Sequence, residues 1–281
     1  MEGIERDFEF HLADFRRVRD LIYRHAGIVL ADSKQQLVYS RLSRRLRALG
    51  LQSFREYLDS LESGRLDDWQ NFVNALTTNL TSFFREPHHF PILAEHLVRR
   101  GAGRPQRVWC SAASTGEEPY SIAMTGIEAL GARPALEVVA TDIDTHCLEQ
   151  AAQGIFPLER GEKLARERLR RFFLRGSGQR AGQMCVRPEV RELVEFRQFN
   201  LLAERYPFEH RFDAIFCRNV MIYFDKPTQL RILERFAPLL VPDGLLFCGH
   251  SENFSNARSV FRLRGKTVYE LAAAGASRAA A

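Results

Sequence analysis

The feature that most constrains the fold is a regular alternation, from residue 106 onward, of short apolar runs with helical stretches. Strands separated by helices are typical of βαβ units, which build a parallel sheet covered by helices on both faces. We therefore predict an α/β fold with a doubly wound sheet. Its strands are expected at Arg107–Ser111, Leu136–Thr141, Val194–Phe199, Phe212–Cys217, Leu245–Gly249 and Lys266–Ala272, and its helices at about 119–130, 145–153 and 227–240.

Three segments stand apart from this alternation. Pro242-Asp243-Gly244 is a turn signal, which we place between the last helix and its strand. Residues 155–192, rich in Arg and Gly, are predicted to form an insertion in the sheet domain, a small β-subdomain. The final GASRAAA has low complexity, and we expect it to be disordered.

The first 80 residues carry helical patterns, and no strand signal precedes residue 105. Besides segments at about 11–25, 54–63 and 67–79, a helix is predicted over Ser33–Leu49, with Gly50 after its end. Its apolar residues recur at i, i+4, i+8 and i+11, which places them on one face: Val38, Leu42, Leu46 and Leu49. We expect an N-terminal helical domain over residues 1–82, followed by the sheet domain over residues 83–281.

Composition restricts the class of protein. No apolar run approaches the ~20 residues that cross a bilayer, and MEGIERDFEFHLADF begins with acid where a secretory signal is basic. A cytoplasmic protein without membrane insertion is therefore expected. The five cysteines are widely spaced and form no CxxC pair, so we predict neither disulfides nor a bound metal. Cys110, Cys217 and Cys248 lie in strand-like runs and are interpreted as small buried residues.

The segment Ser111-Ala112-Ala113-Ser114-Thr115-Gly116-Glu117-Glu118-Pro119 follows the first strand, where open α/β sheets bind ligands. Small residues allow close approach to the backbone, Gly116 tolerates unusual dihedral angles, and Pro119 suits a first helical turn. With one glycine and two carboxylates, this loop would repel a pyrophosphate. A cationic ligand such as S-adenosylmethionine fits better, although a capped helix with a tight turn is the alternative.

Later strand ends also carry polar residues. Asp142 follows the second strand and is placed to accept hydrogen bonds from two ribose hydroxyls, although one of Asp142 and Asp144 is expected to cap the next helix. Asn200 and Leu201 follow the third strand and are suited to an adenine edge and face, although an Asn in a loop is usually a turn residue. Tyr223 follows the fourth strand, where it is either near the transferred methyl group or a core aromatic.

The segment Asn79-Leu80-Thr81-Ser82-Phe83-Phe84-Arg85-Glu86 stands at the expected domain junction. Its polar residues surround two phenylalanines, which is consistent with a helix cap and hydrophobic staple. The functional alternative is a lid, with Asn79 and Thr81 on the cofactor and Arg85 facing its sulfur or the substrate carboxylate.

These motifs together resemble the CheR family of chemoreceptor glutamate methyltransferases. The resemblance is carried by NLTSFFREPHHFPILAEHL, VWCSAASTGEEPYSIA, VVATDIDTHCLEQA, FDAIFCRNVMIYFDKPTQ and PDGLLFCGHSENFS, which occur in the family's order. It implies S-adenosylmethionine as cofactor and methyl transfer to glutamate side chains of chemotaxis receptors. The cofactor contacts it implies are Asn79, Thr81, Arg85, Glu117, Asp142, Asn200, Leu201, Arg218 and Asn219, with Glu117 and Glu118 not distinguished.

The resemblance also implies partners. The basic helix Ser33–Leu49 would lie on an acidic receptor helix bundle through Lys34, Arg41, Arg44 and Arg45. The β-subdomain, around Phe172–Glu195, would hold a peptide at the receptor's C-terminus. A monomer is expected.

The chemistry follows from the substrate. A glutamate carboxylate, with a pKa of ~4.3, is ionised at neutral pH, so neither a general base nor a metal is needed. Positioning should dominate, because oriented reactants can gain roughly 7–11 kcal/mol. We assign Arg85 to orienting the carboxylate or the cofactor, and Tyr223 to the methyl-transfer site.

Two alternatives remain. One is a methyltransferase of the same fold acting on nucleic acid or a small molecule. The net charge of +5 allows nucleic acid, but it is concentrated in one helix, and Cys217–Phe224 lacks the prolines of DNA-adenine methyltransferases. The other is a non-catalytic adaptor that binds the cofactor as a sensor.

Overall fold

The computed structural model describes residues 7–101, 104–254 and 257–272. The chain divides into two compact units. The first, called the helical unit below, covers the chain up to Thr78 together with Tyr223–Asp225. The second, called the sheet unit, covers Asn79–Ile222 and the chain from Lys226 onward. The predicted disordered tail GASRAAA lies outside the described residues.

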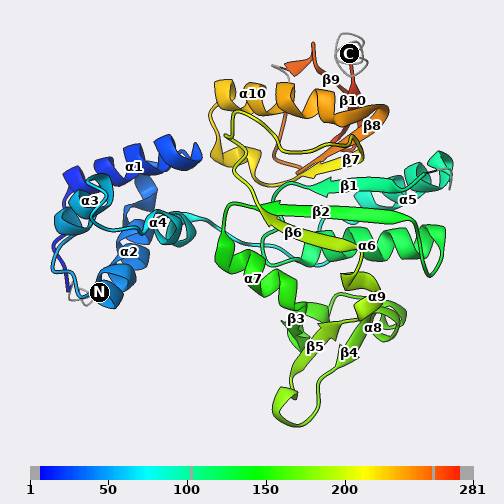
Figure 1. Ribbon diagram of the computed structural model, residues 1–281, viewed down its shortest axis with the longest axis horizontal. Coiled ribbons are helices and arrows are strands. Elements are labelled where there is room, and N and C mark those ends of the chain that lie inside the picture. Colours follow the sequence, from blue (N-terminus) through cyan, green and yellow to red (C-terminus); the bar gives the residue numbers. More distant parts are fainter. Residues whose placement is uncertain (1–6, 102–103, 255–256, 273–281) are drawn as a thin grey trace. The chain divides into compact units, whose positions relative to one another are not determined.

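The helical unit contains the helices α1 (Leu12–Ala26), α2 (Gln35–Leu49), α3 (Phe54–Glu62) and α4 (Trp69–Leu76), shown in Figure 1. The predicted apolar stripe of α2 forms part of the core, because Val38, Leu42 and Leu46 are fully buried. Gly50 ends this helix with a φ of +68°, a left-handed conformation that glycine adopts at little cost. The four predicted helices are confirmed, and a 3₁₀ turn over Asp32–Lys34 replaces the first turn of α2.

The sheet unit is built on seven strands in the order β6-β2-β1-β7-β8-β10-β9 (Figure 1). The first five are parallel, whereas β10 is antiparallel to both β8 and β9. The strand order reverses between β1 and β7, which is where open α/β sheets form a ligand crevice. The strands are β1 (Gln106–Cys110), β2 (Leu136–Asp142), β6 (Val194–Gln198), β7 (Phe212–Cys217), β8 (Leu240–Cys248), β9 (Phe261–Gly265) and β10 (Val268–Leu271).

Helices pack on both faces of this sheet, which confirms the doubly wound fold. Successive side chains of a strand point to opposite faces. Val108 and Cys110 join a core cluster with α5 (His89–Arg100) and α6 (Glu117–Leu130). Trp109 between them packs on Phe236, the last residue of the helix Lys226–Phe236, with ring centroids 5.0 Å apart. The remaining helices near the sheet are α7 (Thr145–Gln153) and α10 (Lys226–Phe236). The sequence pattern did not predict α5 or β9.

The insertion contains a small antiparallel sheet in the order β3-β5-β4. Its elements are β3 (Ile155–Pro157), α8 (Arg166–Phe172), β4 (Phe173–Arg175), β5 (Gln183–Val186) and α9 (Pro188–Arg191).

The predicted turn at Pro242-Asp243-Gly244 is wrong, because these residues lie inside β8. The register between β7 and β8 shifts between Phe212 and Ala214, so a strand irregularity accommodates the turn-forming residues. The helix before it is shorter than predicted: α10 ends at Phe236, and Ala237–Leu239 form a 3₁₀ turn. Pro238 in that turn has no N–H to continue an α-helix.

Candidate active site

The loop after β1 is held against its neighbours by backbone contacts. Ala113 N–H donates to the Thr141 carbonyl at 2.8 Å, and Gly116 is the N-cap residue of α6, with a φ of +100°. A Cβ at Gly116 would stand 2.9 Å from the Ala151 Cβ, so both the space and the dihedral angle require glycine. Gly116 therefore adopts the kind of unusual backbone conformation that the sequence predicted for it.

Asp142 at the end of β2 is fixed by this loop. Its carboxylate accepts hydrogen bonds from the backbone N–H groups of Ser114 (2.7 Å) and Asp144 (2.9 Å). Burial raises the pKa of Asp142, and these hydrogen bonds oppose that shift. Asp144 caps α7 by accepting from Cys147 N–H at 3.1 Å, as expected for one of the two aspartates. Asp142 is the acid that remains at the strand end.

The adjacent carboxylates Glu117 and Glu118 have different surroundings. Glu118 forms a 2.5 Å ion pair with Arg218. Glu117 accepts a hydrogen bond from the Thr115 hydroxyl at 2.6 Å through Oε2. Its Oε1 is buried without a hydrogen-bond partner among the described residues, and the nearest cation, Arg160 Nη1, is 3.5 Å away. Glu117 thus offers an acceptor to a ligand, whereas Glu118 is committed to Arg218.

The ends of β6 and β7 complete this edge of the sheet. Phe199 N–H donates to the Asp142 carbonyl at 2.9 Å, which places the segment after β6 beside Asp142. There Asn200 Oδ1 accepts from Leu202 N–H at 2.9 Å, and Leu201 is buried. Asn219 follows β7 with a φ of +58°.

The segment Asn79–Glu86 is anchored in the sheet unit by its two phenylalanines. Phe83 packs on Phe156, with ring centroids 4.9 Å apart, and Phe84 packs on Phe90 at 4.8 Å. Asn79 Nδ2 donates to Asp144 at 2.8 Å, the Thr81 carbonyl accepts from Arg160 at 3.1 Å, and Arg85 Nη1 donates to the Leu80 carbonyl at 2.7 Å. The two phenylalanines thus join the core of the sheet unit several residues before His88, the N-cap of α5, so the predicted helix cap and staple do not form here.

The sheet unit thus holds all nine predicted cofactor contacts, either at or just after the carboxyl ends of the parallel strands or in the segment Asn79–Glu86, which contacts that edge through Asn79 and Asp144. Tyr223, by contrast, is not part of the sheet unit. Its carbonyl accepts from Val29 N–H at 2.8 Å, and it belongs to the helical unit. The roles of these residues remain predictions.

Two of the four predicted docking residues are engaged within the helical unit. Arg41 donates to the carbonyls of Ala75 in the last turn of α4 and of Thr77, its C-cap residue. Arg45 forms an ion pair with Asp68, which is 2% exposed. Lys34 and Arg44 are exposed. The periodicity of a helix predicts which residues share a face. It does not show which of their positive charges are bound by other groups of the same unit.

Sequence reasoning missed Glu252, which organises the loop after β7. Its buried carboxylate accepts from the backbone N–H groups of Val220 (3.0 Å), Met221 (2.8 Å) and Gly249 (2.5 Å). Burial raises the pKa of Glu252, and these N–H groups oppose that shift. Glu252 lies in the run PDGLLFCGHSENFS, but nothing in its spacing indicates which backbone groups it binds.

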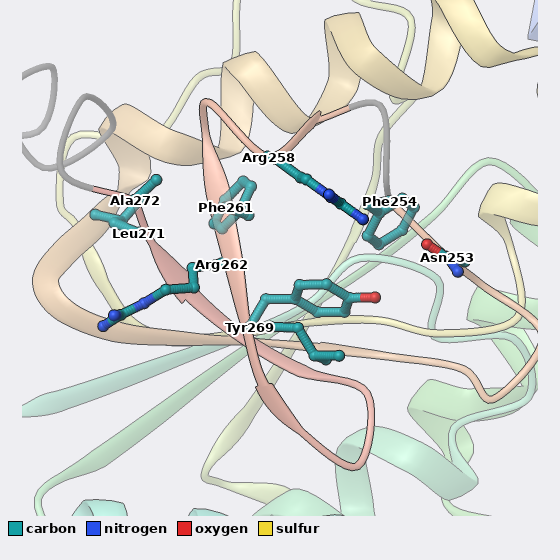
Figure 2. A pocket seen from close by; sticks show the side chains of 9 residues that line it. Asn253, Phe254, Arg258, Phe261, Arg262, Tyr269, Leu271 and Ala272 are labelled. Atoms are coloured by element: carbon teal, nitrogen blue, oxygen red, sulfur yellow. The ribbon is translucent and has the colours of Figure 1, made fainter.

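A pocket of about 800 Å³ lies elsewhere in the sheet unit (Figure 2). Its lining residues lie between Asn253 and Ala272, and they include Phe261 and Tyr269 together with Arg258 and Arg262. None of the predicted site residues lines it, so the volume of this pocket is not evidence about the cofactor site.

The sequence matches two family models. One is described as "CheR methyltransferase, all-alpha domain" and covers residues 13–77, and the other as "CheR methyltransferase, SAM binding domain" and covers residues 79–270. Among the described residues, none of the helices is both long and apolar enough to span a membrane.

Curated relatives match nearly the whole chain. A "Chemotaxis protein methyltransferase" of Salmonella typhimurium is 59% identical over 261 residues, which cover 92% of this chain and 90% of the relative. The protein of that name from Escherichia coli is 57% identical, with coverages of 92% and 91%. "Chemotaxis protein methyltransferase 2" of Pseudomonas aeruginosa is 57% identical, with coverages of 94% and 95%. The chain belongs to the CheR methyltransferase family, whose cofactor is S-adenosylmethionine.

Proposed function

We propose that this chain transfers a methyl group from S-adenosylmethionine to glutamate side chains of chemotaxis receptors, forming methyl esters for sensory adaptation. The observation that carries the proposal is a site with an unsatisfied buried acceptor, Glu117 Oε1, at the carboxyl edge of the sheet. Relatives named for chemotaxis methylation, matched over nine-tenths of the chain, supply the reaction class.

The residues present fit this cofactor. S-adenosylmethionine supplies an electrophilic methyl group on a positively charged sulfur. Glu117 Oε1 suits the cofactor's ammonium group, because this buried carboxylate oxygen accepts no hydrogen bond among the described residues, and its ion pair with the partly exposed Arg160 is long, at 3.5 Å. Asp142 stands where an acid accepts from ribose hydroxyls. Asn200 and Leu201 are assigned to the adenine, while Asn79, Thr81, Arg218 and Asn219 are assigned to the remaining contacts.

The chain's task in the reaction is positioning. The acceptor carboxylate is ionised at neutral pH, with a pKa of ~4.3, so the protein needs no base to remove a proton from it. Arg85 is assigned to orienting that carboxylate or the cofactor, because guanidinium groups bind carboxylates with defined geometry. Tyr223 is assigned to the methyl-transfer site.

We assign receptor docking to α2 and the 3₁₀ turn that precedes it. Lys34 and Arg44 supply exposed positive charge, whereas Arg41 and Arg45 maintain the fold of the helical unit. The surface around Phe172–Glu195 is assigned to a C-terminal peptide of the receptor, and the enzyme is taken to act as a monomer.

Tritium transfer tests the function directly. The purified protein is mixed with tritiated S-adenosylmethionine and chemoreceptor-containing membranes, and the labelled receptor is treated with mild base. Volatile tritiated methanol is the expected product, since a carboxyl methyl ester hydrolyses under these conditions. Label that remains on the receptor would indicate N- or S-methylation. Transfer to added tRNA or DNA would support the nucleic-acid alternative, and cofactor binding without any transfer would support the sensor.

Charge reversal at Arg44 tests docking. Arg44→Glu is expected to raise the KM for receptor several-fold at low salt, and the effect should shrink as salt screens the attraction. The dissociation constant for S-adenosylhomocysteine should not change. Arg55→Glu is the matched control, because Arg55 is an exposed arginine on α3 of the same unit. Equal effects of the two variants, or no effect of Arg44→Glu at any salt, would contradict docking through α2.

A further inference from the structure

Arg85 stands between two residues in an unusual backbone conformation. Phe84 has a φ of +51° and Glu86 a φ of +53°, the left-handed region that non-glycine residues rarely adopt. Such conformations are energetically unfavourable and persist only where the surroundings hold them. Something in the sheet unit must therefore fix the backbone on either side of Arg85.

On one side the surrounding contacts come from α6 and from Arg218, which follows β7. Ser121 of α6 accepts from Phe84 N–H at 2.9 Å. Arg218, after β7, donates through Nη2 to the Arg85 carbonyl. The side chain of Arg218 is fully buried, and its other terminal nitrogen pairs with Glu118. The guanidinium thus joins the backbone of Arg85 to the core of the sheet unit.

Glu86 holds the other side of this arrangement. Its Oε2 lies 3.5 Å from Arg218 Nη2, and its Oε1 accepts from the backbone N–H (3.2 Å) and the ring Nδ1 (2.9 Å) of His250, after β8. Burial raises the pKa of Glu86, but His250 and Arg218 together lower it to about 2. Glu86 is therefore a carboxylate at neutral pH, bridging the loops after β7 and β8.

A metal-ligand role for Glu86 fits less well. Glu86, His88 and His89 place ligand-type atoms within 4.8 Å of one another. However, the guanidinium of Arg218 already lies 3.5 Å from the Glu86 carboxylate and would repel a cation there.

We propose that Glu86 is a positioning residue for methyl transfer, acting through Arg85. Together with Arg218 and His250, its carboxylate holds the strained backbone of Phe84–Glu86, so that the Arg85 guanidinium is presented in one direction. This inference rests on the role of Arg85 in the proposed function.

A double-mutant cycle tests the coupling. The proteins are the wild type, Glu86→Gln, Arg85→Ala and the double variant. The measurements are kcat/KM for receptor methylation and the dissociation constant for S-adenosylhomocysteine. Glu86→Gln keeps the side-chain shape but removes the charge. It is expected to lower kcat/KM by 10-fold or more in the wild type and by less than 3-fold in the Arg85→Ala background, because residues acting through one another are not additive.

If Glu86 has only a structural role, Glu86→Gln should change each measured quantity by the same factor in the wild-type and Arg85→Ala backgrounds. Such additivity in both measurements would overturn the proposal, as would a loss of kcat/KM below 2-fold for Glu86→Gln alone. Glu137→Gln is the matched control, since it removes an ion pair with Arg107 at the opposite end of the strands; its effect should be below 2-fold. If the wild type fails to methylate receptors, the dissociation constants of the four proteins for S-adenosylhomocysteine can still show coupling between Glu86 and Arg85. That result would support the positioning role and reject the proposed function.

Discussion

Arg85→Ala is expected to lower the turnover number for receptor methylation by about 100-fold at saturating cofactor, about 2.7 kcal/mol of transition-state stabilisation. The main barrier to this reaction is bringing two charged reactants into the correct orientation. The guanidinium of Arg85 is the group in this segment that can orient a carboxylate. Initial rates with tritiated cofactor and receptor membranes measure the effect. A loss below tenfold would contradict the assignment.

Two control variants separate this role from general damage. Arg85→Lys keeps the charge but loses the planar arrangement of donors, so activity should lie between the wild type and the alanine variant. Arg107→Ala removes an arginine at the amino end of β1, where it pairs with Glu137, and should change turnover by less than 2-fold.

Glu117→Gln is expected to raise the dissociation constant for S-adenosylmethionine by about 10- to 100-fold, because hydrogen bonds to charged groups contribute roughly 1.5–3 kcal/mol. The same substitution should not lower the melting temperature of the cofactor-free protein. Oε1 of Glu117 has no hydrogen-bond partner among the described residues, and the only ion pair described for it is the 3.5 Å contact with the partly exposed Arg160, so the substitution removes a buried charge that is weakly compensated. Calorimetric titration and thermal unfolding give the two quantities.

Glu118→Gln is the adjacent control, with the opposite result for stability. Its ion pair with Arg218 is buried, and removal of one partner of such a pair costs about 3–5 kcal/mol. The melting temperature of the cofactor-free protein should therefore fall. If Glu118→Gln leaves it unchanged while Glu117→Gln lowers it, the roles given to the two carboxylates are reversed.

The helices and strands that the sequence predicted best are those with one clear apolar pattern. The stripe of α2 and the five parallel strands are examples, because burial on one or both faces sets the period of the residues. The α5 helix was missed although Phe90, Leu93 and Leu97 are buried. β9 was missed because three of its residues, Arg262–Arg264, are exposed, leaving no alternation to detect.

Local chemistry also determined part of the site. The sequence sufficed to place Gly116, Asp142 and Asn200 after strands, and parallel strands bring their carboxyl ends to one edge. Spacing could not distinguish Glu117 from Glu118, because neighbouring residues of a helix point in different directions and only one of these meets Arg218.

The sequence by itself determined the doubly wound sheet, the N-terminal helices and the loops that carry the candidate cofactor contacts, since periodicity and strand ends are local properties. Only the tertiary structure decided which charges are paired. Arg45 meets Asp68 across 23 positions of sequence, and Arg218 meets Glu118 across 100. Such pairs depend on which elements pack together, and burial then makes each pair costly to break.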